Sequence, residues 1–104
     1  MPLKLTIITP ESTFYDGEMD SVVAPGSIGY FGVLARHAPM IAAVGLGVLK
    51  LSTGTETSWY AVGDGVAEMH DNHLTILVDQ IVAAPNEMEA ERKSEDMQLN
   101  SPRA

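Results

Sequence analysis

Cysteine is absent from this sequence of 104 residues, so the chain can form neither a disulfide framework nor a thiolate metal site. Long hydrophobic runs are absent as well, and no segment approaches the roughly 20 apolar residues that a membrane helix requires. Basic residues are few: six lysines and arginines stand against fourteen aspartates and glutamates, for a net charge of −8. This balance argues against binding to nucleic acid or to anionic membrane surfaces, because both select basic clusters.

Hydrophobic residues nevertheless make up 45% of the chain, a share typical of a globular protein. The length allows one domain with a core but hardly two. Met1–Lys4 leads directly into strand-like sequence, from which we expect neither a signal peptide nor a transit segment. An acidic protein of this kind would dock most readily on basic protein surfaces.

Short segments of alternating or β-branched residues follow one another along most of the chain. Leu3–Thr9 places Leu3, Leu5 and Ile7 on one side, which predicts a half-buried strand. Further strands are predicted at Ser12–Tyr15, Met19–Ala24, Met40–Val44, Val48–Ser52, Glu56–Val62, Val66–His70 and His73–Asp79, with a hairpin turn at Asp16-Gly17. Many short strands separated by turn residues predict a mainly β fold, an antiparallel β-sandwich of about ten short strands.

The composition changes after residue 85, where an acidic segment begins. Asn86 is a candidate N-cap, with Glu89 placed to complete a capping box, and Glu89 can also pair with Lys93. A helix of about ten residues is marginal on its own, however. The apolar residues of this segment, which do not line up as a stripe, are Met88, Ala90 and Met97. We therefore predict a β-sandwich domain at 1–84 and an acidic tail at 85–104 that forms a partial helix or is disordered.

The stretch Gly26–Met40, GSIGYFGVLARHAPM, combines glycines at every third position with apolar side chains. Gly26, Gly29 and Gly32 predict a tightly turned chain, because glycine adopts backbone angles that strain other residues. A phosphate-binding turn is the alternative interpretation. It requires a helix to begin after the loop, and Pro39 would interrupt such a helix.

Large apolar side chains at two places in the sequence indicate a surface for a partner. Ile28, Tyr30 and Phe31 cannot all point inward from a turned loop, and exposed apolar residues on a glycine scaffold indicate docking. The alternative is that all three are tucked beneath the loop. Trp59 and Tyr60 face opposite sides of a predicted strand, so one is expected in the core and the other is a candidate partner anchor.

Catalytic and metal-binding patterns are weak in this sequence. His70 and His73 flank a predicted tight turn at Asp71-Asn72, and a metal site needs three or four converging ligands, so we interpret them as turn residues facing solvent. Serine, histidine and aspartate are present, but without a nucleophile elbow or a spacing that favours a triad. We therefore expect no catalytic, cofactor-binding or metal-binding residues.

Gly26–Met40 resembles a signature of the epsilon subunits of F-type ATP synthases, roughly G-x-x-G-x-x-G-[IVL]-L-P-x-H-A-P-L. The residues that fit it are Gly26, Gly29, Gly32, Val33, Leu34, His37, Ala38, Pro39 and Met40. The resemblance covers roughly residues 3–84. The further segments that are similar to the family are Asp20–Gly26, Gly45–Leu51, Tyr60–Met69 and Leu74–Asp79. The family's amino-terminal domain is a flattened β-sandwich, in agreement with the pattern of strands.

The resemblance implies a non-catalytic rotor subunit of the central stalk. Such a subunit binds the gamma subunit on one side and the polar loops of the membrane c-ring at its base, and it couples the two during ion-driven ATP synthesis. By position, the residues expected to contact the c-ring or gamma are Ser27, Ile28, Tyr30, Phe31, Arg36, His37 and Met40. The resemblance also implies a peripheral membrane protein on the cytoplasmic face of the bacterial inner membrane, with the plastid thylakoid as the alternative.

Three positions of this interface depart from the family's pattern. Ile28 stands where a polar residue is usual and Tyr30 where glutamate is frequent, so this loop is more apolar than the family's. Arg36 replaces the family's common glycine, and we expect that it could contribute an ion pair.

The segment after Pro85 is shorter than in full-length family members, which continue into a hairpin of two helices. Only 104 − 85 = 19 residues follow Pro85, enough for part of the first helix. In some members that helix carries an ATP-binding motif, [IL]-D-x-x-R-A, and Ala90 stands where the arginine would be. We therefore expect no ATP binding and little inhibition of ATP hydrolysis.

Two other interpretations stay open on the sequence alone. One is a free-standing binding or regulatory β-sandwich that has lost its rotor partner. The other is an unrelated small enzyme, which would need a pocket of convergent polar groups that the sequence does not indicate.

Overall fold

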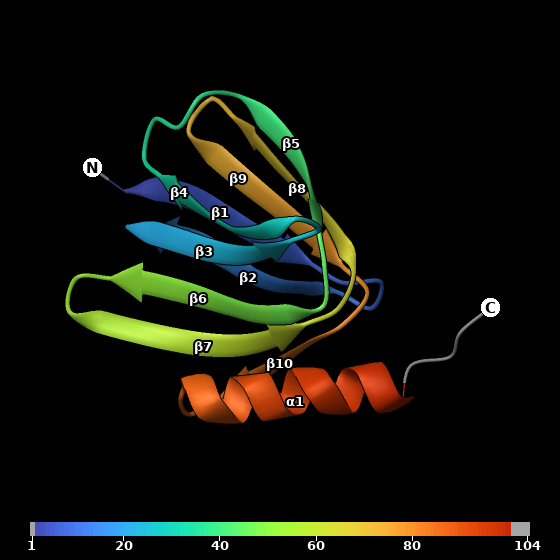
Figure 1. Cartoon of the computed structure of the whole chain (residues 1–104). Coiled ribbons are helices and arrows are strands. Elements are labelled where there is room, and N and C mark those ends of the chain that lie inside the picture. Colours follow the sequence, from blue (N-terminus) through green and yellow to red (C-terminus); the bar gives the residue numbers. More distant parts are fainter. Residues whose placement is uncertain (1, 101–104) are drawn as a thin grey trace.

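Ten strands and one helix make up the computed structural model, which describes residues 2–100 and the side chains of residues 2–98 (Figure 1). The strands are β1 (Leu3–Ile8), β2 (Thr13–Met19), β3 (Ser21–Gly26), β4 (Gly29–Leu34), β5 (Met40–Val44), β6 (Gly47–Thr53), β7 (Glu56–Val62), β8 (Gly65–His70), β9 (His73–Val78) and β10 (Ile81–Ala84). The helix α1 spans Glu87–Asn100.

The strands form one continuous sheet that folds into the two layers of a sandwich (Figure 1). One layer runs β10-β7-β6-β3 with β4 added beside β3, and the other runs β5-β8-β9-β1-β2. The mainly β sandwich predicted from the strand pattern is confirmed. The expectation of a wholly antiparallel sheet is wrong at one place, because β1 inserts between β2 and β9 and pairs in parallel with β9. Side-chain periodicity reports the buried face of a strand but not its direction.

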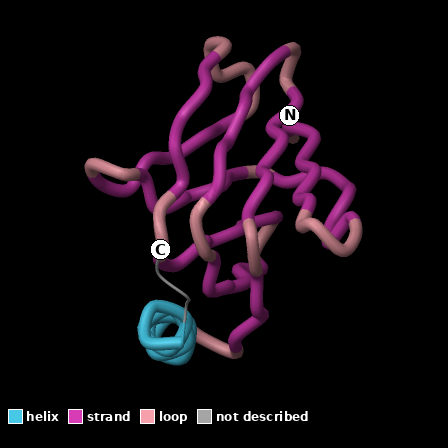
Figure 2. Tube along the Cα trace, turned by 90° about the vertical axis from the view of Figure 1, so that its right-hand side faces the viewer, coloured by secondary structure: helices cyan, strands magenta, loops and turns pink. Residues whose placement is uncertain are grey.

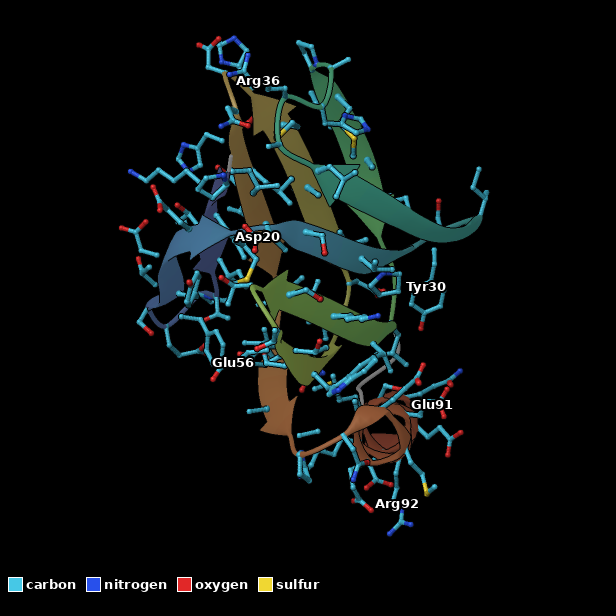
Figure 3. The ribbon with its side chains drawn as sticks, turned by 90° about the vertical axis from the view of Figure 1, so that its left-hand side faces the viewer. Asp20, Tyr30, Arg36, Glu56, Glu91 and Arg92 are labelled. Atoms are coloured by element: carbon cyan, nitrogen blue, oxygen red, sulfur yellow. The ribbon has the colours of Figure 1, made fainter. Side chains whose placement is uncertain are left out.

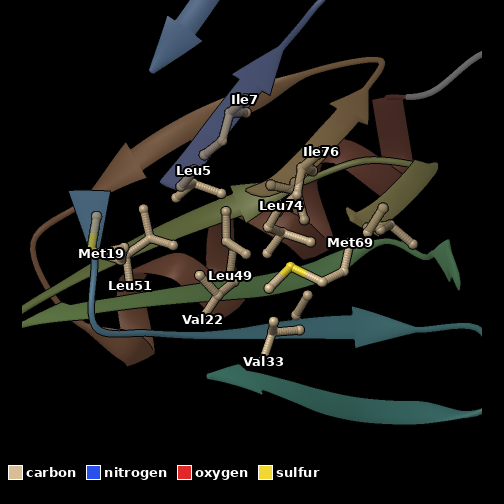
Figure 4. Packing of buried hydrophobic residues seen from close by; sticks show 14 of the residues in the cluster. Leu5, Ile7, Met19, Val22, Val33, Leu49, Leu51, Met69, Leu74 and Ile76 are labelled. Atoms are coloured by element: carbon tan, nitrogen blue, oxygen red, sulfur yellow. The ribbon is translucent and has the colours of Figure 1, made fainter. Parts of the chain in front are cut away.

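Alternating side chains fill the space between the layers with aliphatic groups (Figure 4). Leu3, Leu5 and Ile7 are fully buried, as predicted, and the parallel register sets Leu5 beside Leu74 and Ile7 beside Ile76. The opposite layer contributes Val22, Val33, Leu49, Leu51 and Val62. Burial of each large aliphatic side chain is worth about 1.5–3 kcal/mol, so this cluster is the main source of stability.

The predicted hairpin turn at Asp16-Gly17 is wrong, because both residues lie inside β2. The chain turns earlier, where the amide of Thr9 donates to the carbonyl of Ser12 at 2.9 Å. Asp16 instead accepts a hydrogen bond from the hydroxyl of Thr6 on β1 at 3.3 Å. An Asp-Gly pair between two strands is a strong signal for a hairpin turn. Here the chain turns instead at Thr9 and Ser12, and the hydrogen bond from Thr6 keeps Asp16 in the strand.

Two strands were not predicted individually. β4 pairs with β3 along its whole length, so Gly32 lies in a regular strand opposite Val23 rather than in a turn. β10 pairs with β7 and carries only small and aliphatic residues. The glycines of β4 and the brevity of β10 hide the alternation by which strands are recognised.

Helix α1 packs on the outer face of the first layer, where it contacts β6, β7 and β10 (Figure 2). The predicted cap is confirmed: the amide of Glu89 donates to Oδ1 of Asn86 at 2.9 Å. Met88, Ala90 and Met97 do not form one apolar stripe, as expected, because Met88 is exposed; the buried row of the helix consists of Ala90, Ser94 and Met97. The Ser94 hydroxyl donates to the carbonyl of Glu91 at 2.8 Å, so burial leaves no polar atom unpaired.

Two neighbouring aromatic residues of β7, Trp59 and Tyr60, point to opposite sides of the first layer. Tyr60 packs against the core, with its ring at right angles to Phe14 at 5.7 Å between centroids. Trp59 lies on the outer face, half-buried, with Nζ of Lys50 5.3 Å from its ring centroid. Tyr60 is therefore the core residue of the pair and Trp59 the one that faces outward, and a role of Trp59 as a partner anchor stays a prediction.

No helix within residues 2–100 is long and apolar enough to span a membrane. The last part of the predicted tail at 85–104, residues 101–104, lies outside the described part of the chain.

Replacing Asn86 by alanine should lower the free energy of unfolding by about 1 kcal/mol, because the amide of Glu89 loses its acceptor. Met88→Ala is the matched control, since Met88 is exposed on the same helix, and it should change stability by less than about 0.5 kcal/mol. Urea unfolding of the two variants and the unmodified protein tests this. Equal midpoints for the two variants would show that the cap contributes nothing.

Candidate functional site

The hairpin between β3 and β4 is closed by a two-residue turn, Ser27 and Ile28. Gly29 has a φ of 139°, a conformation that other residues rarely adopt, and a Cβ at Gly26 would lie 2.6 Å from the Gly29 carbonyl oxygen. Two of the three predicted glycine positions therefore require glycine, whereas at Gly32 an added Cβ would meet only the Val22 carbonyl oxygen, at 3.9 Å.

A groove of about 520 Å³ opens between this hairpin and β5. Strand β3 pairs with β5 only at Gly26 and Val44, and beyond this pair β5 runs away from β3 and β4 (Figure 1). The lining is mostly apolar, and it includes six of the seven predicted interface residues: Ser27, Ile28, Tyr30, Phe31, His37 and Met40. The seventh, Arg36, does not line the groove.

The side chains of the hairpin point in different directions. Ile28 is fully exposed and Tyr30 is 60% exposed, whereas Phe31 packs against the core. The alternative in which all three are tucked beneath the loop is therefore wrong. The Tyr30 hydroxyl also accepts a hydrogen bond from the amide of Val48 at 3.2 Å, beyond the last residue pair of β3 and β6 at Val23 and Lys50.

The β4–β5 loop is attached to the turn between β8 and β9. The amide of Arg36 donates to Oδ1 of Asn72 at 2.8 Å, and Nδ2 of Asn72 donates to the carbonyl of Pro2 at 3.1 Å. The amide of Lys4 donates to the carbonyl of Asn72 at 3.0 Å. One asparagine thus joins three segments at the end of the molecule opposite Glu91, where Figure 3 labels Arg36.

A second apolar surface was missed in the sequence. On the outer face of the second layer, aligned residues of four strands form a row: Ile8, Ala43, Val66 and Leu77. Ile41, 75% exposed, lies beside this row on β5. The signal was Leu77, an apolar residue at a position of β9 that alternation assigns to solvent. We call these five residues the outer apolar face.

The alternative sites do not assemble a reactive centre. Strand β4, not a helix, follows the glycine turn, so the phosphate-binding geometry is not formed there. His73 Nε2 lies 2.8 Å from the Thr6 hydroxyl, and His70 Nδ1 lies 3.2 Å from the carboxylate of Asp71. Within the described part of the chain, no three histidine, aspartate or glutamate side chains are grouped to hold a metal ion.

The structure thus defines the class of the protein by its fold: a small β-sandwich followed by a packed helix, with two apolar surfaces. A family described as ATP synthase, Delta/Epsilon chain, beta-sandwich domain matches residues 2–84. The chain belongs to this family, and its relatives are ATP synthase epsilon chains.

Two relatives show how far the similarity extends. The ATP synthase epsilon chain of Leptospira interrogans is 39% identical over 93 residues, which cover 88% of this chain and 73% of the relative. The epsilon chain of a Nostoc species is 37% identical over 81 residues, which cover 76% of this chain and 59% of the relative.

The fold is also found in a solved assembly. A chain in the cryo-EM structure of the Euglena gracilis mitochondrial ATP synthase, comprising OSCP, F1 and the c-ring, matches with a TM-score of 0.76 at 20% identity. The match covers 98% of this chain and 68% of that chain. The two chains therefore share a fold that includes both the sandwich and the helix.

Gly29→Ala should destabilise the protein by about 1–3 kcal/mol through backbone strain, although the added methyl group would meet no atom within 4 Å. Gly32→Ala, three residues along the same hairpin, is the matched control and should leave stability unchanged or raise it by about 0.4–1 kcal/mol. Thermal unfolding of both variants measures the difference. A Gly29→Ala variant as stable as Gly32→Ala would contradict the strained turn.

Proposed function

We propose that this chain is a non-catalytic central-stalk subunit of an F-type ATP synthase that couples the gamma subunit to the membrane c-ring during ion-driven ATP synthesis. The observation that carries the proposal is the presence of two apolar surfaces on one sandwich, the groove and the outer apolar face. A subunit that links two partners needs two such surfaces on a body that does not deform between them.

The groove is the proposed contact with the polar loops of the c-ring. Ile28 is fully exposed at the tip of a turn that Gly26 and Gly29 fix, so its side chain can enter a depression on a partner. Phe31 and Met40 form the inner wall and pack against the core, which ties the contact to the body of the sandwich. The contact is mainly apolar, since Ile28 and Tyr30 replace polar and acidic residues that are usual in the family.

The outer apolar face is the proposed contact with gamma. Its residues come from four adjacent strands, and an exposed apolar area of this kind on a sheet is typical of a protein interface. Ala43 belongs to this face and also lines the groove, so the two surfaces meet at β5. Force applied at one surface therefore reaches the other through the hydrogen-bonded strands of one layer.

The helix is assigned no inhibitory role. Ala90 stands at the position of the arginine of the family's ATP-binding motif and is fully buried against the sheet. We propose that the chain binds neither ATP nor nucleic acid, and that it exerts little inhibition on ATP hydrolysis. Through its partners it would be peripheral to the membrane, on the cytoplasmic face of the bacterial inner membrane.

Truncation of the outer apolar face should weaken gamma binding. The double variant Ile41→Ala/Leu77→Ala should bind the gamma subunit from the same genome at least about tenfold more weakly, since the loss of central apolar contacts typically costs more than 1 kcal/mol. Met88→Ala, which removes an exposed apolar side chain from the helix, is the control and should bind normally. Titration calorimetry with the full chain measures both. No binding by the unmodified chain would favour a free-standing binding sandwich.

Truncation at the hairpin tip should affect the ring and not gamma. Ile28→Ala should weaken attachment to purified c-ring in nanodiscs by about tenfold while thermal unfolding and gamma affinity stay unchanged, because Ile28 touches solvent only. Leu34→Ala is the matched control: Leu34 is 62% exposed on the same hairpin but does not line the groove. An unfolded Ile28→Ala variant, or equal losses for the two variants, would contradict the assignment.

A further inference from the structure

The backbone of Arg36 is strained. Its φ of 67° lies in the left-handed region, which glycine adopts freely and which asparagine and aspartate tolerate. The other non-glycine residues with positive φ in the described chain are Asp71 and Asn72, both of tolerant types. Strain at a long charged residue persists only where the surroundings enforce it, and such positions cluster at functional sites.

The surroundings that hold Arg36 in this conformation contact its backbone and not its side chain. Its amide donates to Asn72 at 2.8 Å, and the amide of His37 donates to the carbonyl of Leu34 at 3.1 Å to close the turn. A glycine at position 36 would allow the same two backbone hydrogen bonds with less strain. The fold therefore gives no reason for an arginine at position 36.

The guanidinium of Arg36 makes no ion pair or hydrogen bond within residues 2–98. Two other basic groups are engaged: Arg92 pairs with Glu89 at 3.6 Å and Lys50 lies over Trp59. The carboxylate on the adjoining turn, that of Asp71, pairs with His70. Lys4 is also an exposed cation without a side-chain partner in the described residues, but it lies in regular strand β1, so Arg36 differs from it in the strain of its backbone.

We propose that Arg36 is retained in this strained conformation in order to present its guanidinium to a carboxylate of the gamma subunit. The inference rests on the proposed function. Gamma is favoured over the ring because Arg36 does not line the groove, and because its amide is bound to the β8–β9 turn, at the end of the layer that carries the outer apolar face. An arginine at the edge of an apolar contact fixes the orientation of the partner and excludes partners without a matching carboxylate.

The test compares Arg36→Gly with Arg36→Ala in the full chain, by calorimetric titration of gamma at about 50 mM and about 500 mM salt. Both variants should bind about tenfold more weakly at low salt, and the loss should shrink at high salt as screening weakens the pair. Arg36→Lys should recover part of the affinity. Arg36→Gly should also melt a few degrees above Arg36→Ala, because it relieves the strain that alanine keeps.

Arg92→Ala is the matched control, since it removes an exposed arginine from the helix and should leave gamma affinity unchanged. If the unmodified chain binds gamma and the Arg36 variants bind it equally well at both salt concentrations, the inference is wrong while the proposed function stands. A loss confined to c-ring binding would overturn it as well. If the unmodified chain does not bind gamma, the proposed function fails and the inference with it.

Discussion

The arrangement of this protein depends on one residue pair, Gly26 and Val44, at which the sheet passes from one layer to the other. The amide of Gly45 donates to the carbonyl of Pro25 at 2.8 Å and reinforces the junction. Because the pairing of β3 and β5 ends there, the β3–β4 hairpin projects freely and the groove opens beside it. A Cβ at Gly26 would press on the Gly29 carbonyl oxygen, so the junction and the turn constrain each other.

This junction makes β5 the strand that serves both surfaces. Met40 and Ala42 point from β5 toward the groove, whereas Ile41 points to the opposite face of the strand and lies beside the outer apolar row. A strand that contributes alternate residues to two contacts cannot move relative to one without moving relative to the other. Two adjacent surfaces on one strand therefore keep a fixed position relative to each other, which a flexible linker between them would not ensure.

The sequence predicted the elements that follow simple alternation and failed where another contact decides. The buried face of β1 needed only periodicity, and the bounds of β7 needed only the glycine-containing turns on either side of it, at Gly54 and Gly63. The prediction of a turn at Asp16-Gly17 was wrong because Asp16 lies in a strand, where it accepts a cross-strand hydrogen bond from Thr6. Strand β4 was missed because its glycines mask the alternation of side chains. Six of the seven candidate interface residues do meet at one groove, since they come from one hairpin, the loop that follows it and the first residue of β5. To predict the outer apolar face, the order of the strands in the sheet would have to be known, and no local sequence pattern contains it.

Helix α1 determines which face of the sandwich is left for a partner. Val48 and Ala61 lie on the outer face of the first layer, and both are buried although they do not belong to the central core. They are covered because Ala90 and Ser94 are small enough for the helix to approach the sheet closely. Without the helix, the sandwich would present an apolar area on each outer face, and a partner could bind on either. With the helix in place, Val48 and Ala61 are closed to a partner, whereas the outer apolar face of the second layer stays exposed, and this restricts how the subunit can be oriented in an assembly.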